Sequence, residues 1–219
     1  MAELRQWILT RRILPGAPIR QDAIAAALGV SRVPVREALK ILEGEGHVVY
    51  RPHRGYTLVQ LDIDDLLEIY RIREILEAEA VRRSVPQLRA EEHERMVEAI
   101  DDMERASIEG NIIALTAANR RFHFTIFEAA GMPRLQHQIL LLWDASDPYR
   151  SIYFFEDENR DTVNREHREI MELVRAGAVD ELLGSLQRHR SNAISGLHRI
   201  LEGEAAVDRG ERARPGRVD

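Results

Sequence analysis

Six segments with apolar residues at helical spacing follow one another after residue 61, a pattern that leaves few folds open. Gly110, Gly131 and Gly177 separate several of the segments, and every connecting loop is short. Short loops favour antiparallel neighbours, so the sequence predicts an all-α antiparallel six-helix bundle. The predicted helices span about residues 62–85, 89–108, 111–130, 133–154, 159–176 and 179–201.

The first 61 residues have a different pattern. Short helical periodicities cover Leu4 to Arg12 and Gln21 to Leu28, and a third begins at Ser31 and ends near Gly44. Two β-rich runs then flank the segment RPHRG, which is typical of a hairpin. This order predicts a winged helix-turn-helix and, for the whole chain, a mainly α fold. The predicted parts are a winged domain, 1–61, a helical domain, 62–201, and a disordered polar tail, 202–219.

The third predicted helix, within SRVPVREALKILEGEG, has two chemically different faces. Ser31 can cap its start, and about 100° of rotation per residue places Arg32, Arg36 and Lys40 in one stripe beside a separate apolar stripe. A solvated surface helix has the same pattern, but the preceding helix and the following hairpin favour a helix that carries basic side chains into the major groove of DNA. Residues 1–61 hold nine Lys and Arg against five Asp and Glu, whereas the rest holds 22 against 32, so the positive charge is on the part expected to bind DNA.

The segment LPGAPIRQDAIAAALGVSRVPVREALKILEGEGHVVYRPHRGYTLV resembles the winged helix-turn-helix of the GntR family of bacterial transcription regulators along its length. The resemblance implies that Ser31, Arg32 and Arg36 contact operator bases and phosphates. It also implies that Arg54 and Gly55 form the tip of the wing, in the minor groove. Lys40, on the same stripe, is a further candidate for DNA contact.

Histidines in the helical region have a spacing that brings them together. His167 and His189 lie on consecutive predicted helices, equally far from residue 178 in the turn between them, so an antiparallel hairpin places them level with each other. Asn119 and His123 are four residues apart, on one face of another helix, which is a spacing that lets two side chains hold one ion. The alternative is that each histidine is a hydrogen-bonded residue in a polar seam.

The segments ANRRFHFTIFEAAGMPRL and EHREIMELVRAGAVDELLGSLQRHR resemble the FCD effector domain of the FadR subfamily of GntR regulators, and six helices resemble its VanR-like branch. Metal-binding members use one Asp and three His, which implies a site of Asn119, His123, His167 and His189. Asn119 departs from that pattern, and its amide oxygen is a weaker donor than a carboxylate. Three imidazoles suit a divalent transition metal, with zinc as the first choice and nickel or manganese as alternatives.

Three further residues are candidates for binding an effector. Arg73 shares a helical face with apolar residues, so its guanidinium is expected to point into the bundle and to need a partner. That partner is either Glu77, one turn later, or the carboxylate of a ligand. Tyr149 and Arg150 are further candidates for lining the pocket, although an exposed helix face explains them equally well.

The interpretation is a ligand-responsive repressor that acts in the cytoplasm as a homodimer on an inverted-repeat operator. A small carboxylate effector at the metal site would release or reorient it. The chain has no cysteine, no run long and apolar enough to span a membrane and no secretory signal pattern. Two alternatives stay open: a metal-dependent hydrolase, which leaves residues 1–61 unexplained, and a DNA-binding protein with a purely structural metal. We expect no enzymatic activity.

Overall fold

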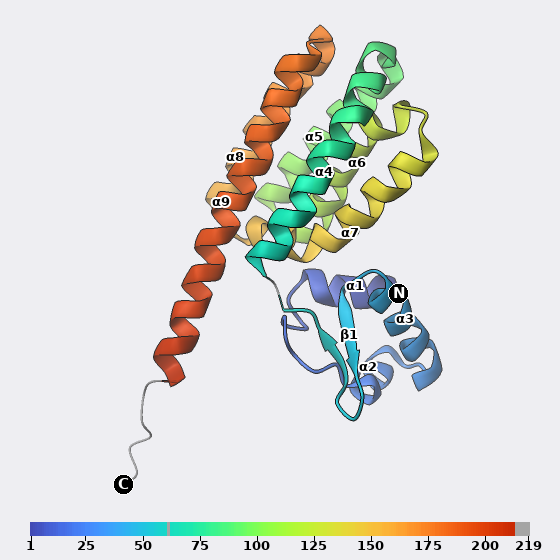
Figure 1. Cartoon of the computed structure of the whole chain (residues 1–219), viewed down its shortest axis with the longest axis vertical. Helices are drawn as coiled ribbons and strands as arrows, with labels where there is room; N and C mark the ends of the chain where they lie inside the picture. The colour runs from blue at the N-terminus through green and yellow to red at the C-terminus, as the bar shows by residue number, and fades with distance from the viewer. Residues whose placement is uncertain (61, 213–219) are drawn as a thin grey trace.

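The computed structural model describes residues 1–60 and 62–212 of the 219-residue chain, with side chains as far as residue 202. The described residues form helices and one two-stranded sheet (Figure 1). A winged helix-turn-helix precedes an all-helical bundle, so the expected mainly α fold class is confirmed. The buried apolar residues fall into two separate cores, one within residues 4–58 and the other within residues 66–197.

The N-terminal domain consists of three short helices and a hairpin. Its elements are α1 (Ala2–Leu9), α2 (Gln21–Leu28), α3 (Arg32–Gly44), β1 (Val48–Arg51) and β2 (Gly55–Leu58). The two strands pair antiparallel, with Val48 opposite Leu58. The first helix ends before its apolar pattern does, because the backbone turns at Arg11, where φ is 56°.

The turn between α2 and α3 fixes the direction of α3. Gly29 ends α2 in the left-handed conformation, at φ 65°, which glycine adopts without steric cost. Ser31 then takes the extended N-cap conformation, although its hydroxyl makes no capping hydrogen bond. Leu39 and Leu42 are fully buried in the N-terminal core. Because these residues hold one face of α3 against the core, the opposite face is left exposed.

The bundle follows the predicted helices closely. Its elements are α4 (Ile63–Ser84), the short 3₁₀ helix η1 (Val85–Gln87), α5 (Ala90–Ile108), α6 (Ile112–Ala129), α7 (Pro133–Phe155), α8 (Asp157–Ala176) and α9 (Val179–Arg212). Gly177 ends α8 at φ 64° and lets the chain reverse into α9. That reversal makes α8 and α9 an antiparallel hairpin.

The C-terminal tail differs from its prediction. Helix α9 continues to Arg212, so residues 202–212 are helical rather than disordered (Figure 1). The segment EGEAAVDRGER is poor in apolar residues but rich in Glu, Ala and Arg, which have high helix propensity and can extend a helix that packing has already started. The rest of the predicted tail, residues 213–219, lies outside the described residues, as does residue 61.

The two domains meet where α1 packs against α7, at the lower end of the bundle in Figure 1. A cleft of about 220 Å³ lies at this junction, lined by residues of both domains that include Ile8, His47, Tyr149 and Ile152. Helix α7 thus belongs to the bundle and also supports the N-terminal domain. Among the described residues, no helix is long and apolar enough to cross a membrane.

Candidate functional site

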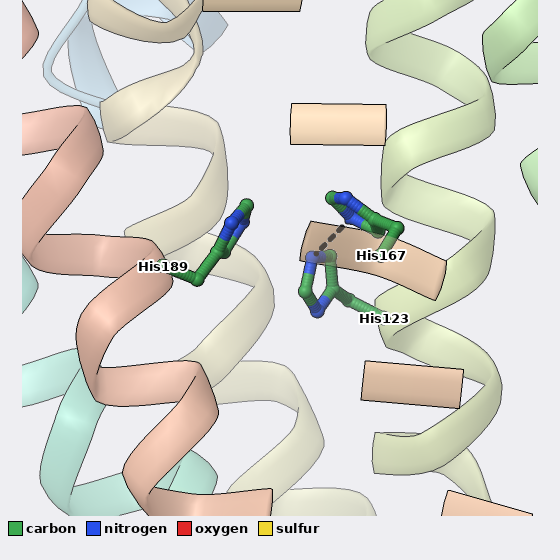
Figure 2. Close-up of side chains that lie close together, drawn as sticks. All are labelled: His123, His167 and His189. Atoms are coloured by element: carbon green, nitrogen blue, oxygen red, sulfur yellow. Dashed lines mark hydrogen bonds between the residues drawn. The ribbon is translucent and has the colours of Figure 1, made fainter. Parts of the chain in front are cut away.

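Three histidines from three helices meet inside the bundle (Figure 2). His123 comes from α6, His167 from α8 and His189 from α9, and their nearest ring nitrogens all lie within 4.8 Å of one another. The Nε2 atoms of His123 and His167 are 3.0 Å apart. This is close to the separation of neighbouring nitrogens bound to a single ion at about 2.0–2.1 Å each. The antiparallel α8–α9 hairpin brings His167 and His189 level, as the sequence spacing predicts.

Hydrogen bonds orient two of the three rings. His167 Nδ1 lies 2.7 Å from the carbonyl oxygen of Val163, and His189 Nδ1 lies 2.6 Å from Glu166 Oε2. Since both acceptors are oxygens, each Nδ1 donates its proton, which leaves Nε2 as the nitrogen of each ring that could bind a metal ion. Carbonyl and carboxylate partners of this kind are the usual supports of metal-binding histidines.

Burial keeps two of the three histidines uncharged. It lowers the pKa of His167 to about 3, with a further contribution from His189. Burial also lowers the pKa of His123 well below its ordinary value, and the neighbouring His167 and His189 act in the same direction. At neutral pH His123 and His167 are therefore neutral imidazoles, the form that binds metal ions.

A small cavity of about 30 Å³ adjoins the histidines. His123 and His189 line it, and Asn119, one helical turn before His123, lines it as well. Asn119 is 2% exposed, so its amide is within the bundle rather than on its surface. The donor set of three imidazoles and an amide fits a divalent transition metal and does not distinguish one such metal from another.

At the other end of the cavity, one carboxylate accepts hydrogen bonds from three side chains. Glu77 accepts hydrogen bonds from Arg73 Nε at 2.8 Å, Trp143 Nε1 at 2.7 Å and Arg190 Nη1 at 3.0 Å. Burial alone would raise the pKa of Glu77, but Arg73 and Arg190 lower it, so the carboxylate is ionised. Glu77 is thus the internal partner of Arg73, one of the two partners that the sequence left open.

The positive charge of Arg150 is less completely neutralised inside the cavity than the charge of Arg73. Arg150 lines the same cavity, donates to Ser146 Oγ at 3.1 Å and lies over the Trp143 ring, with its guanidinium carbon 4.2 Å from the ring centroid. Its ion-pair partner Asp147 does not line the cavity. Burial lowers the pKa of Arg150, and Asp147 opposes this shift only in part.

The cavity consequently has an excess of positive charge. Three guanidinium groups line it, from Arg73, Arg150 and Arg190, whereas Glu77 is the one carboxylate among the described residues that line it. Asp147 pairs with Arg150 from outside the cavity, and Arg73 and Arg190 share the charge of Glu77. Buried cations that share one anion are unfavourable. This arrangement favours a negatively charged ligand.

Tyr149 does not belong to this group. Its hydroxyl bonds to the backbone N–H and carbonyl of Asp62, each at 3.0 Å, and lies 3.2 Å from Asp65 Oδ2. Successive residues of a helix point about 100° apart, so Tyr149 faces the interdomain cleft while Arg150 faces the cavity. The expectation that Tyr149 lines an effector pocket stays a prediction; in the structure the residue lies apart from the Arg150 cavity and holds the start of α4.

The basic stripe of α3 lies on the outside of the N-terminal domain. Ser31, Arg32, Arg36 and Lys40 are all exposed, and a shallow groove includes the last three of them. Arg32 forms an ion pair with Asp22, and Lys40 pairs with Glu37 at 3.1 Å. These pairs are exposed and weakly held, so the arginines and the lysine can exchange them for phosphates or bases.

The hairpin that follows α3 in the chain supplies another basic group at its tip. Arg54 is exposed, and Gly55 begins β2 at φ 76°, in the left-handed region. His53, at φ 64°, shares this conformation and makes the turn tight. A tight turn presents Arg54 at the end of the wing.

A series of ion pairs leads from the cavity toward the N-terminal domain. Arg150 pairs with Asp147, and Arg120 donates to Asp147 at 2.9 Å and to Asp144 at 2.6 Å. Arg5, on α1, lies 3.9 Å from Asp144.

Arg5 also connects to the end of the exposed helix. It donates to Glu45 Oε1 at 2.6 Å, and Glu45 is the C-cap residue of α3. Burial raises the pKa of Glu45, while Arg5 opposes the shift. The charged groups between the two domains therefore form a connected set.

Several of these residues were missed by the sequence analysis. The sequence analysis assigns no role to Glu166, although this residue adjoins His167 and is within one residue of the level of His189 across the α8–α9 turn. Arg190, Trp143 and Ser146 had no recognisable signal, because their partners lie far away in the sequence.

Comparison with known proteins places both parts of the chain. Residues 68–192 match the FCD domain family, and residues 1–58 match the family described as bacterial regulatory proteins, gntR family. The chain is 28% identical over 204 residues to the uncharacterized HTH-type transcriptional regulator YdhC of Bacillus subtilis (strain 168), covering 91% of this chain and 90% of that protein.

Two further similarities add to these matches. A probable D-xylose utilization operon transcriptional repressor of Paenarthrobacter nicotinovorans is 36% identical over 121 residues, covering 54% of this chain and 52% of that protein. The solved structure of McbR/YncC from E. coli has the same fold, with a TM-score of 0.79 at 23% identity, covering 91% of this chain and 95% of that one.

Proposed function

Because the chain belongs to the GntR family of bacterial regulators and carries an FCD domain, we propose that it is a transcriptional repressor controlled by a small carboxylate bound in the bundle. The family makes the protein a transcription regulator rather than an enzyme. Three parts of the proposal go beyond the family: repression rather than activation, the carboxylate ligand and the bound metal. The proposal also includes action in the cytoplasm as a homodimer.

Binding of operator DNA is assigned to the exposed face of α3 and to the wing. Arg32 and Arg36 are proposed to contact bases in the major groove, and Ser31 and Lys40 to contact the DNA backbone. Arg54 is proposed to contact DNA from the tip of the wing. One short helix covers only a few base pairs, so two copies would read two inverted half-sites. Repression is supported by the name of the D-xylose relative, which is a probable repressor.

The histidine cluster is proposed to hold a divalent metal, with zinc as the first choice and nickel or manganese as alternatives. His123, His167 and His189 would bind it through nitrogen, and Asn119 would add a weaker oxygen contact. When bound, the ion would offer an open coordination position to a carboxylate oxygen. The oriented Nε2 atoms and the Glu166 support are the features that favour this assignment.

The excess of guanidinium groups is the single observation that carries the proposed ligand class. Arg73, Arg150 and Arg190 converge on one cavity with one carboxylate, Glu77, so an anion would be attracted between them. The cavity, at about 30 Å³, is roughly the size of one or two water molecules. A carboxylate of several carbon atoms would therefore have to separate the surrounding helices.

That separation provides a route to the DNA-binding domain. Pulling Arg150 toward a ligand would weaken its pair with Asp147 and would shift the charged set that Arg120 connects to Asp144. Arg5 links this set to Glu45 at the end of α3. A coupling of about 1–3 kcal/mol between the two sites would change operator occupancy several-fold or more.

The test measures metal first and regulation second. Metal content by mass spectrometry is compared between the wild type and the double variant His167→Ala, His189→Ala, with His198→Ala as a control on the exposed part of α9. We expect metal in the wild type and the control and none in the double variant. Equal metal in all three proteins would contradict the site.

Operator binding is then titrated in a panel of small carboxylates, with a mobility-shift readout. At least one carboxylate is expected to weaken operator binding by the wild type and to lose this effect in Arg150→Ala. If metal is present but no carboxylate changes operator binding or the melting temperature, the metal is structural and the effector proposal fails.

A further inference from the structure

The cleft at the junction of the two domains is large enough to hold a small molecule. Its volume is about 220 Å³, and an apolar cavity of about 150 Å³ can bind benzene. The cleft can therefore hold one six-membered ring with a substituent. Its walls are mainly apolar and come from both domains, with side chains that include Ile8, Leu58, Val59, Ile69, Ala145 and Ile152.

The charges around the cleft favour an uncharged ligand. Among the described residues that line it, Arg11 and Asp65 are charged, and their charges are opposite. Burial lowers the pKa of His47, and Arg5 acts in the same direction, so this imidazole is neutral at pH 7. A carboxylate in the cleft would lie near Asp65 and would lose hydration against apolar walls. The cleft thus differs from the bundle cavity, where guanidinium groups are in excess.

His47 is a buried polar side chain without a hydrogen bond. It is 7% exposed and lines the cleft, and no hydrogen bond within the described residues reaches its ring. Leaving a buried polar group unpaired is unfavourable, so a ligand that bonds to the ring would gain affinity.

The backbone holds His47 firmly at this position. Gly46, at φ 81°, ends α3 in a Schellman motif, in which the His47 N–H donates to the Leu42 carbonyl at 2.9 Å. The His47 carbonyl accepts from the Val59 N–H at 3.0 Å. Because both backbone groups are bonded within the N-terminal domain, the imidazole is presented to the cleft from the end of α3.

The other uncharged polar side chains of the cleft already have partners. The Tyr149 hydroxyl bonds to the backbone of Asp62, and Ser151 Oγ donates to the Pro148 carbonyl at 2.8 Å. His47 is therefore the polar group best placed to recognise a ligand. A matching ligand is mainly apolar and carries one polar group.

We propose that the interdomain cleft is a second ligand site, which binds an uncharged, ring-sized apolar molecule through a hydroxyl group that donates a hydrogen bond to the His47 ring. Phenol is the simplest molecule of this class. The site is separate from the bundle cavity, since no described residue lines both. A ligand there would contact α1 and β2 on one side and α4 and α7 on the other, so it would restrain the orientation of the N-terminal domain.

The hydroxyl contact is tested with phenol and toluene, two probes of similar size of which only phenol carries a hydroxyl. Their affinities are measured by calorimetry for the wild type and for His47→Phe, which keeps an aromatic ring and removes the acceptor. The ratio of phenol affinity to toluene affinity should fall by roughly 2–10-fold in His47→Phe, the effect of one hydrogen bond between uncharged groups. An unchanged ratio, or no binding of either probe at millimolar concentration, would overturn the proposal.

The position of the ligand is tested by filling the cleft. Ala145 lines it from α7, so Ala145→Phe should weaken the binding of both probes at least tenfold. Ala117→Phe places the same side chain at an exposed position on α6 and should bind both probes as the wild type does. The double variant His167→Ala, His189→Ala should also keep wild-type phenol affinity. A loss confined to this double variant would place phenol in the bundle and contradict the cleft site.

Nuclear magnetic resonance of the wild type tests the same contact without any substitution that could disturb folding. In protein labelled with ¹⁵N-histidine, saturating phenol should shift the ring nitrogens of His47 and leave those of His198, 49% exposed on α9, in place. Phenol that binds without shifting the His47 resonances would contradict the proposed hydrogen bond.

These measurements require neither operator nor metal, so they are independent of the proposed function. If phenol binds the cleft but no carboxylate changes operator binding, the effector proposal fails and the cleft site stands. If carboxylates act through the bundle but phenol does not bind the cleft, the cleft site fails alone.

Discussion

Replacing Glu77 by glutamine tests whether the bundle holds more positive charge than it can neutralise by itself. The substitution keeps the size of the side chain and removes its charge. In the wild type Glu77 is 3% exposed and accepts hydrogen bonds from Arg73, Arg190 and Trp143. The oxygen of the glutamine amide can still accept hydrogen bonds, but its NH2 group cannot, and the neutral amide offsets the charge of neither guanidinium.

The expected loss of stability is large. Removing one partner from a buried ion pair costs about 3–5 kcal/mol, because the remaining charge is left without compensation. For a domain of this size, 1 kcal/mol lowers the melting temperature by roughly 2–4 °C, so Glu77→Gln should melt roughly 6–20 °C below the wild type. The two arginines lose the same carboxylate, which places the expectation in the upper part of that range.

Glu74→Gln is the matched control, since Glu74 lies on the same helix and pairs with Arg71 at the surface. Surface pairs contribute about 0–1 kcal/mol, so this variant should melt within a few degrees of the wild type. Thermal unfolding of the three proteins is followed by circular dichroism. If Glu77→Gln lost no more stability than Glu74→Gln, the argument for an excess of buried positive charge would fail.

A second experiment tests whether a carboxylate ligand restores the stability that Glu77→Gln loses. Formate is the smallest carboxylate, and in Glu77→Gln it can enter the cavity beside Arg73 and Arg190 and supply the missing negative charge. A ligand that binds only the folded state raises the melting temperature with concentration. Formate should therefore stabilise Glu77→Gln more than Glu74→Gln, and an equal effect on both would show that it binds elsewhere.

Three other substitutions test separate parts of the mechanism. Arg36→Ala should weaken operator binding by about 1–3 kcal/mol and relax base preference, and an unchanged mobility-shift titration would remove Arg36 from the base contacts. Arg5→Ala should leave carboxylate binding intact while reducing the effect of the carboxylate on operator affinity, and an unchanged ratio of the two operator affinities would exclude Arg5 from the coupling. Glu166→Gln should lower metal affinity by about 10–100-fold in a chelator competition, because His189 loses the carboxylate that orients it, and wild-type affinity would contradict that role.

Much of the helical architecture could be predicted because it depends on local signals. The bundle helices follow the apolar periodicity and the glycine breaks, and the α8–α9 hairpin follows from a turn at Gly177. The same turn explains why the spacing of His167 and His189 alone predicts that the two side chains meet. Glu77 could be named as a partner of Arg73 because it lies one turn away on the same helix.

The sequence could not predict contacts that depend on how the helices are rotated and stacked. Arg190 bonds to Glu77 from 113 residues away, a pairing that no local pattern encodes. Tyr149 and Arg150 are adjacent, and only the rotation of α7 decides which of them reaches the cavity. The polar composition of residues 202–212 likewise indicates disorder, although the segment is helical, because its residues combine high helix propensity with low hydrophobicity.

The double role of α7 limits how this protein could be adapted to a new signal. On this helix Trp143 and Arg150 line the cavity, while Asp144 and Asp147 belong to the charged set that leads to the other domain. A substitution on α7 that alters ligand preference therefore risks altering the response to the ligand as well. The α4 and α9 walls of the cavity lie outside that charged set. Ligand preference could be redesigned there while the link to DNA is preserved, which makes those two helices the natural place to build a biosensor.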